Sequence, residues 1–249
     1  MLFSLWRRRK KENLLLKAIL RVFENEARGR VLDFGAAQGM YSIELHRMGF
    51  DVVGVDVTEG FQHKDLMKFV KLEGQGALPF QDDSFDLVLM AEVIEHLKDP
   101  YGLIKELGRI LKKGGKIILS TPNILNLKSR FRYLIEGAYE YFREPPIEHA
   151  GYNLATGIDV SQVHVMPWRF HELEYLLKEC GFRIEDICTS VYEGFGYFLL
   201  LPFIRFQLNA KANRSIEKGG VDYRRINKIL LTNELLYGRH LIIKAEKNS

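Results

Sequence analysis

The chain has 249 residues, a formal net charge of +4 and 47% hydrophobic residues. This length can bury a sizeable core, so we expect residues 1–249 to form one domain, and the modest charge gives no support to a nucleic-acid-binding class. Cys180 and Cys188 provide neither a disulfide framework nor metal-ligand spacing. No apolar run reaches the ~20 residues of a membrane span and no export signal is visible, so we expect a cytoplasmic protein.

Residues 1–28 predict a basic tail followed by a helix. A few apolar residues precede the basic run 7–11, which suits either a solvated tail or peripheral contact with an anionic membrane. Apolar residues then recur with helical spacing from Leu14 to Phe23, which predicts a helix packed on the sheet.

Apolar runs and amphipathic stretches alternate along the rest of the chain, as is typical of an α/β protein. The expected strands are 30–34, 51–56, a short one near 70–73, 85–91, 115–121, 182–188 and 239–246, and the expected helices are 39–48, 62–70, 101–112 and 169–180.

Two of the predicted strands end in acids that suit a nucleoside. Asp33 closes the first strand and is followed by Gly35 and Gly39, while Asp56 closes the second strand. Glycines allow a sharp turn and a close approach of the backbone to a ligand. Ligands of an open parallel sheet bind at the carboxyl ends of its strands, where Asp56 can accept hydrogen bonds from a ribose diol.

The glycine pattern is not that of a dinucleotide site, which requires G-x-G-x-x-G. Here Ala37 stands at the central glycine of the pattern Asp33-x-Gly-x-Ala-x-Gly39. The segment 30–39 resembles the first motif of class I S-adenosylmethionine-dependent methyltransferases, whose usual form is acid-x-Gly-x-Gly-x-Gly.

Later motifs extend this resemblance over most of the chain: 77–90 with its Leu-Pro-Phe loop, 92–96, the Lys-Lys-Gly-Gly turn at 112–115 with the strand after it, and 164–182. The resemblance implies a Rossmann-like, seven-stranded, mostly parallel sheet with helices on both faces and an antiparallel last strand. It also implies S-adenosyl-L-methionine as cofactor and S-adenosyl-L-homocysteine as product.

The resemblance assigns the cofactor contacts residue by residue. Asp33 is expected to orient the glycine loop or to meet the methionine ammonium group, Asp56 to bind the ribose, and Val57 to contact the adenine. By alignment Gly74 stands where relatives carry an acid that reads the adenine amino group, so neighbouring groups are expected to substitute. The remaining expected contacts are Gly35, Ala36, Gly39, Gln75, Gly76, Ala77 and Ala91.

Chemistry is expected at the end of the fourth strand. A hydroxyl acceptor loses a proton on methylation, so a general base helps, and His96 is the first candidate, with Glu92 and His164 as further catalytic residues and His149 in reserve. A purely structural role for His96, as a helix cap, is the alternative.

We predict no metal, but one pattern keeps a metal open. If residues 92–96 turn helically, Glu92, Glu95 and His96 share a face and His164 can join them. This spacing resembles the Glu-x-x-Glu-His…His arrangement of metal-dependent small-RNA and quinone-pathway O-methyltransferases, in which a metal would activate the acceptor oxygen.

Two long segments, 123–166 and 190–237, are expected to be helical insertions over the active-site edge. The aromatic stretch 131–152 predicts either a lid that lines the acceptor site or a packed helical hairpin. The very apolar stretch 195–208 is expected to cover the site, dimerise, touch lipid or simply pack on the body.

The sequence therefore predicts a methyltransferase for a small-molecule acceptor, with a hydroxyl oxygen favoured and lipid- or saccharide-linked acceptors included. A non-catalytic nucleoside-binding or regulatory protein and a metal-dependent methyltransferase of RNA termini are the alternatives. No nucleic-acid partner is expected, and a homodimer and peripheral membrane contact stay open.

Overall fold

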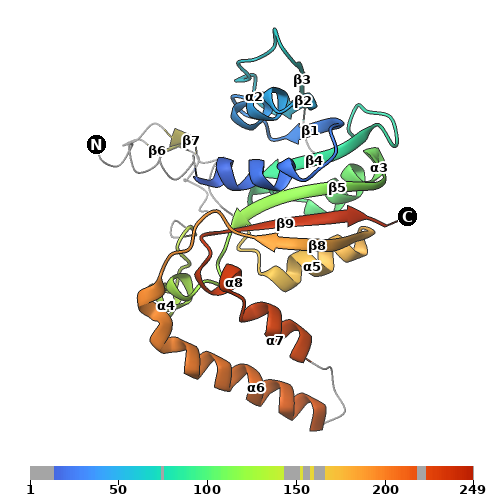
Figure 1. Ribbon diagram of the computed structural model, residues 1–249. Helices are drawn as coiled ribbons and strands as arrows, with labels where there is room; N and C mark the ends of the chain where they lie inside the picture. The colour runs from blue at the N-terminus through green and yellow to red at the C-terminus, as the bar shows by residue number, and fades with distance from the viewer. Residues whose placement is uncertain are drawn as a thin grey trace.

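The computed structural model describes residues 14–73, 76–142, 166–217 and 223–248, together with two short paired strands, β6 (Tyr152–Asn153) and β7 (Ile158–Asp159). Its centre is a seven-stranded sheet in the order β3-β2-β1-β4-β5-β9-β8 (Figure 1). The strands are β1 (Arg30–Phe34), β2 (Asp51–Asp56), β3 (Lys68–Lys71), β4 (Phe85–Ala91), β5 (Leu111–Pro122), β8 (Phe182–Cys188) and β9 (His240–Lys247).

The strand directions confirm the predicted sheet. Neighbours from β3 through β5 pair in parallel, whereas β9, the last strand of the chain, lies antiparallel between β5 and β8. Parallel neighbours need crossover connections, which helices supply on the two faces of the sheet. The carboxyl ends of β1, β2, β4 and β5 consequently lie along one edge.

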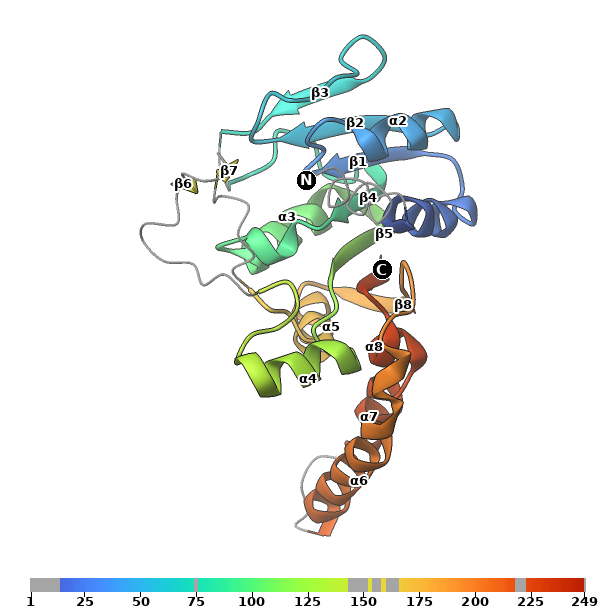
Figure 2. The ribbon, with the colours of Figure 1, turned by 90° about the vertical axis from the view of Figure 1, so that its left-hand side faces the viewer.

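Helices cover both faces of the sheet (Figure 2). On one face, a helix over 14–24 and α2 (Met40–Arg47) bury Ile19, Phe23 and Leu45 against the strands. On the other face lie α3 (Pro100–Ile110) and α5 (Phe170–Glu179), which belong to a second apolar cluster. Because both faces are buried at the centre of the sheet, β1, β2 and β4 are near-continuous apolar runs, which is why their positions could be predicted from the sequence.

Helix α3 shows how local sequence fixes an element. The Asp99 carboxylate accepts a hydrogen bond from the Gly102 N–H at 2.9 Å, and Pro100 occupies the first helical position. Leu103, Ile104 and Leu107 then recur at the spacing of one helical face and are buried against the sheet. Loss of this cap would cost about 1 kcal/mol of stability.

The helix predicted over 62–70 is wrong. The segment before β3 forms a turn in which the N–H groups of Leu66 and Met67 both donate to the His63 carbonyl. Met67 of this segment, together with the preceding Phe61, is buried without a helix, because both side chains pack into the apolar core that includes the helix over 14–24. Strand β5 also begins earlier than predicted, at Leu111, directly after α3 ends at Ile110.

The remaining helices lie beyond the carboxyl edge of the sheet, although Leu235 of α8 (Asn233–Tyr237) still packs into the core cluster beside β5 and β9. Helices α4 (Leu127–Glu136) and α8 meet around the buried residues Leu127, Leu236 and Tyr237. A short 3-10 helix, η3 (Phe195–Leu200), leads into the long helix α6 (Leu201–Glu217), and α7 (Arg224–Leu230) returns beside it. Both views show α6 and α7 projecting from the body as an arm (Figures 1 and 2). Within the described residues, no helix is long and apolar enough to cross a membrane.

Candidate functional site

Strand register brings the predicted site residues to one edge of the sheet. Phe34 of β1 pairs with Val55 of β2 and with Met90 of β4. Asp56 and Ala91, each one residue further along, therefore flank the loop that follows β1. This confirms the expectation that the acids after the first two strands lie at neighbouring strand ends.

The glycine loop, 35–39, turns sharply at both of its glycines. Gly35 has φ +80° and Gly39 has φ +86°, a region that glycine adopts without steric cost. A Cβ at Gly35 would lie 2.4 Å from Val93 Cγ2, and one at Gly39 would lie 2.8 Å from a ring carbon of Phe61. The sharp turn is as predicted, but the missing side chains make room for the protein's own residues.

Asp33 acts from beneath this loop. Its side chain is 1% exposed and accepts a hydrogen bond from the Ser42 hydroxyl at 2.5 Å, in the first turn of α2. Burial raises the pKa of Asp33 to about 6, against the lowering effect of the Ser42 hydrogen bonds. Of its two expected roles, this placement favours orienting the loop over meeting an ammonium group directly.

Asp56 holds two loops together at the end of β2. Its Oδ2 accepts from the Ala37 N–H at 2.8 Å, and its Oδ1 accepts from the Thr58 N–H at 2.7 Å and the Thr58 hydroxyl at 2.8 Å. A carboxylate offers about four acceptor positions, so Oδ2 retains one, and Oδ1 regains one when the Thr58 hydroxyl rotates.

The surroundings of Asp56 suit a purine. Val57 is 58% exposed and offers an apolar surface beside the carboxylate, and Gly76 and Ala77 are exposed across from the end of β1. Gln75 lies outside the described residues. A cavity of about 190 Å3 opens here between the end of β1, the loop at 76–78 and the first turns of α3, lined by Phe34, Gly76, Leu78, Asp99, Gly102, Leu103 and Glu106.

Two charged residues of α3 hold this loop in place. Glu106 accepts a hydrogen bond from the Leu78 N–H at 3.0 Å, and Arg109 donates to the carbonyls of Leu78 and Phe80 at 3.1 and 2.9 Å. Sequence reasoning missed both residues, because an acid and a base three residues apart on a helix are usually a surface ion pair.

Glu92 lies at the tip of β4 in a strained backbone conformation. Its φ is +54°, which costs a non-glycine residue about 1–3 kcal/mol and is most often retained where function requires it. Its side chain is 27% exposed and accepts a hydrogen bond from the Ser120 hydroxyl at 2.8 Å. Burial raises the pKa of Glu92 to about 7, so this carboxyl can exchange a proton near neutral pH.

His240 joins Glu92 from the far end of the chain. Its Nε2 lies 3.9 Å from Glu92 Oε2, and its Nδ1 is 2.6 Å from the Ser190 hydroxyl. No sequence motif pointed to His240, since it begins β9 and reaches the site only through the antiparallel pairing of β9 with β5.

The helical turn expected over 92–96 forms only in part. Residues Ile94–His96 make the 3-10 helix η1, but Glu92 precedes it in its positive-φ conformation. Glu92 bonds to Ser120 and Glu95 bonds to Thr121 at 3.1 Å, and neighbouring strand residues point to opposite faces of a sheet. The two carboxylates bond to neighbouring residues of β5 yet stay close enough for the charge of Glu92 to raise the pKa of Glu95. Among the described residues, they form no metal-binding group of three with His96.

In the described ranges, the structure supports no catalytic contact for the histidines that the sequence singled out. His96 is half-buried at the end of η1, while His164 and His149 lie outside the described residues. In the part of the chain that the structure describes, no three His, Cys, Asp or Glu side chains come together as metal ligands.

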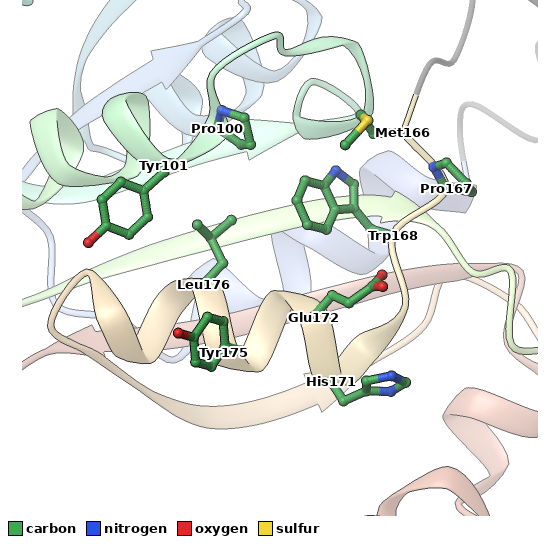
Figure 3. Close-up of a pocket in the computed structure, with 9 residues that line it drawn as sticks. All are labelled: Pro100, Tyr101, Met166, Pro167, Trp168, His171, Glu172, Tyr175 and Leu176. Atoms are coloured by element: carbon green, nitrogen blue, oxygen red, sulfur yellow. The ribbon is translucent and has the colours of Figure 1, made fainter.

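A second hollow lies on the α3 and α5 side of the sheet (Figure 3). This groove of about 670 Å3 runs between α3, the segment that leads into α5, and α5 itself. The Trp168 indole N–H donates to the Ile94 carbonyl at 3.2 Å, which ties the groove wall to η1. Its lining is mostly apolar: Pro100, Tyr101, Met166, Pro167, Trp168, His171, Glu172, Tyr175 and Leu176.

Comparison with known proteins decides the family. Residues 5–187 match the model of a methyltransferase domain. The chain belongs to this methyltransferase family. Two curated relatives are named ubiquinone biosynthesis O-methyltransferase. That from Xanthomonas oryzae pv. oryzae (strain PXO99A) is 28% identical over 181 residues, which cover 67% of this chain and 68% of the relative. That from Xylella fastidiosa (strain 9a5c) is 28% identical over 170 residues, which cover 56% of this chain and 66% of the relative.

Solved structures agree with the fold of this methyltransferase. An S-adenosylmethionine-dependent methyltransferase from Archaeoglobus fulgidus is similar with a TM-score of 0.59 at 18% identity, covering 95% of this chain and 94% of that one. One from Methanosarcina mazei has a TM-score of 0.55 at 21% identity, covering 91% and 96%. The protein is thus an S-adenosylmethionine-dependent methyltransferase with a Rossmann-like fold, as predicted.

The residues of this methyltransferase fit that cofactor. Asp56 keeps acceptor positions for a ribose diol, and Val57 presents an exposed apolar surface to a base. The 190 Å3 cavity opens at the same edge of the sheet, between the end of β1, the loop at 76–78 and α3. Gly35 and Gly39 let the loop at 35–39 turn sharply, and the places where their side chains would stand are filled by Val93 and Phe61.

Proposed function

We propose that the protein methylates a hydroxyl oxygen of a small molecule, with Glu92 as general base. The observation that carries the proposal is Glu92 itself, a partly exposed carboxyl at the tip of β4 whose pKa burial raises to about 7. Such a group is ionised about half the time at neutral pH and can accept the proton that an attacking hydroxyl loses. The relatives named ubiquinone biosynthesis O-methyltransferase support oxygen as the acceptor atom.

S-adenosylmethionine supplies an electrophilic methyl group on a sulfonium. The chain's own residues therefore have to bind the cofactor, position the acceptor and deprotonate its hydroxyl group. Asp56 and the loop that it braces would hold the nucleoside. The methionine portion of the cofactor would lie close to Gly35, Ala36 and Gly39. Asp33 keeps α2 and this loop in register through Ser42. Ala91 ends β4 beside them, and the acceptor oxygen has to lie in line with the methyl group at about 3–3.5 Å.

Proton transfer sets the preferred acceptor chemistry. A phenolic hydroxyl has a pKa near 10, as in tyrosine, whereas an alkyl hydroxyl lies several units higher. Transfer to a carboxylate of pKa about 7 is uphill by roughly 4 kcal/mol from a phenol, and by much more from an alkyl alcohol. Glu92 therefore favours a phenolic or similarly acidic hydroxyl, including one carried by a lipid. His96 would assist at the same edge, and His240 and Ser190 would receive or orient the proton on Glu92.

The test is S-adenosylhomocysteine production from S-adenosylmethionine with catechol and phenol, against benzylamine and glucose as amine and alkyl-hydroxyl acceptors. Turnover with the phenols only, with a rate that rises through pH ~7 and is lost in Glu92→Gln, is the expected result. Glu193→Gln, which changes a nearby carboxylate paired with Arg239 at 2.9 Å, should keep the same pH dependence. Turnover with benzylamine alone, or an unchanged pH profile in Glu92→Gln, would overturn the assignment of Glu92 as base for oxygen methylation.

A further inference from the structure

The arm and the η3 segment at its base carry a row of large apolar side chains that stay mostly exposed, although the Phe195 ring stacks on that of Tyr237 in α8 at 4.9 Å. Phe195, Phe198 and Leu199 of η3 and Phe203 and Phe206 of α6 are each between 57% and 74% exposed. We name these five residues the apolar ridge. Single exposed apolar residues are ordinary, but contiguous large patches mark contact surfaces.

The helix geometry gathers the ridge on one side of the arm. Leu199 and Phe203 are four residues apart and Phe203 and Phe206 are three apart, the spacings of one helical face. The opposite side of α6 is already occupied, since Ala212 is buried and the Asn227 amide of α7 donates to the Leu208 carbonyl at 2.9 Å. Leu201 and Ile204 pack toward α4 and α8. Helix α6 is therefore apolar on two faces, and only one of them has a partner within the described chain.

Helix α4 continues the surface at the base of the arm. Phe131 lies 5.2 Å from the ring of Tyr197 in η3, and Leu134 and Ile135, which follow Phe131 by three and four residues, are 76% and 68% exposed. Because α4 follows β5 and η3 follows β8, both elements leave the sheet at the carboxyl edge, where Glu92 lies.

The charges beside the ridge indicate what covers it. The chain holds 32 Asp and Glu residues in 249, yet residues 194–216 contain none, while the bases Arg205 and Lys211 lie among them. A symmetric contact with a second copy would place these bases against one another without acids to neutralise them. An anionic lipid surface neutralises them at about 1 kcal/mol per base near the surface.

We propose that the apolar ridge is a membrane-docking surface that inserts its phenylalanines at the interface of an anionic bilayer. Aromatic and leucine side chains on one face of a helix, flanked by bases, bind in the plane of a bilayer without spanning it. The docked arm brings the carboxyl edge of the sheet beside the bilayer, where an acceptor held in the membrane can reach it. The proposal does not depend on which acceptor is methylated or on the role of Glu92.

The test is co-sedimentation of the full chain with phosphatidylcholine vesicles, with and without roughly one-third phosphatidylserine. The test variant is Phe203→Asn with Phe206→Asn, and Tyr101→Asn with Tyr175→Asn removes two exposed aromatic residues from the groove between α3 and α5 as a matched control. We expect the wild type and the control to bind the phosphatidylserine vesicles and the test variant to bind at least ~10-fold more weakly. Thermal midpoints check that each variant folds.

Three results would overturn the proposal. The first is equal vesicle binding by the test variant and the wild type. The second is binding that disappears only when the basic run 7–11 is neutralised, which would assign it to the amino-terminal tail. The third is a dimer in size-exclusion chromatography that the test variant breaks, with no vesicle binding by the wild type. If the double variant does not fold, Arg205→Gln replaces it, with roughly fivefold weaker binding expected on phosphatidylserine vesicles and unchanged binding as the contradicting result.

Discussion

The backbone N–H of Ala37 donates a hydrogen bond to Asp56 Oδ2 at 2.8 Å, so the turn after β1 is fastened to the tip of β2. To point its N–H this way, Ala37 adopts φ +46°, in the left-handed region that favours glycine. Relatives of this kind usually carry glycine here, and the hydrogen bond explains how alanine is retained. The same carboxylate that would bind the ribose thus also shapes the loop around the methionine portion.

Ala37→Gly should stabilise the protein. Glycine removes the backbone strain of alanine at positive φ, and this gain outweighs the larger conformational entropy that glycine has in the unfolded chain. We expect a net gain of about 0.5–1 kcal/mol in the free energy of unfolding and a thermal midpoint higher by about 2 °C. Ala36→Gly is the matched control, because Ala36 is 4% exposed and its φ is not positive. It should lower the midpoint, so equal shifts in both variants would show that Ala37 carries no strain.

Asp56→Ala should abolish stabilisation by the cofactor. Binding to the native state adds about 2.7 kcal/mol at a hundredfold excess over Kd, which is a shift of several degrees in a chain of this size. Differential scanning fluorimetry with S-adenosylmethionine measures the shift, and NAD should give none, because the loop lacks the pyrophosphate pattern.

The control for that experiment is Glu59→Ala, which removes an exposed carboxylate three residues away that pairs with Lys71 at 3.1 Å. It should retain the full shift. A shift that survives in Asp56→Ala would mean that other groups hold the ribose.

The sequence alone locates most of the sheet. Strands β1, β2 and β4 have the predicted bounds, because strands buried on both faces are short apolar runs bounded by glycine and charge. Strand β8 has the predicted bounds as well, although it is an edge strand with mostly exposed or half-buried residues. The order of Asp33, Gly35, Gly39 and Asp56 also predicted the sharp turn between β1 and α2, since a strand, a tight turn and a helix are all local in sequence.

Non-local contacts were out of reach of that reasoning. His240 meets Glu92 only because β9 returns beside β5, and nothing near His240 in the sequence signals this pairing. The segment at 62–70 has helical spacing, but its apolar Met67 is buried by a turn and the residues after it pair with β2. Glu92 was expected on one helical turn with Glu95 and His96, but it precedes the 3-10 helix in a positive-φ conformation.

Ser120→Ala should move the pH dependence of methylation upward. The Ser120 hydroxyl donates to Glu92 and lowers its pKa, so its loss raises that pKa further. The base must be ionised to accept a proton, so the rise of the rate with pH should shift to higher pH by roughly one unit, the equivalent of a ~1.5 kcal/mol hydrogen bond.

Thr121→Val is the matched control for Ser120→Ala. It removes the neighbouring hydroxyl of β5, which bonds to Glu95 instead of Glu92, and should shift the pH profile less than Ser120→Ala does. Equal shifts in the two variants would show that the strand, rather than the hydrogen bond to Glu92, sets the profile.

Asp33→Asn should stabilise the folded protein at pH 7.5 and lose this advantage in acid. Burial raises the pKa of Asp33 from 3.8 to about 6, so ionising the folded state is harder than ionising the unfolded chain. The resulting destabilisation is absent below pH ~4, grows as the pH rises to ~6 and then stays at up to about 3 kcal/mol, whereas asparagine never ionises. Thermal midpoints should therefore differ by several degrees at pH 7.5 and converge near pH 4.

Asp51→Asn, at an exposed acid that begins β2, controls for loss of charge and should show no such convergence. A variant that is less stable than wild type at every pH would mean that the hydrogen bonds from Ser42 to the carboxylate outweigh the cost of burying it.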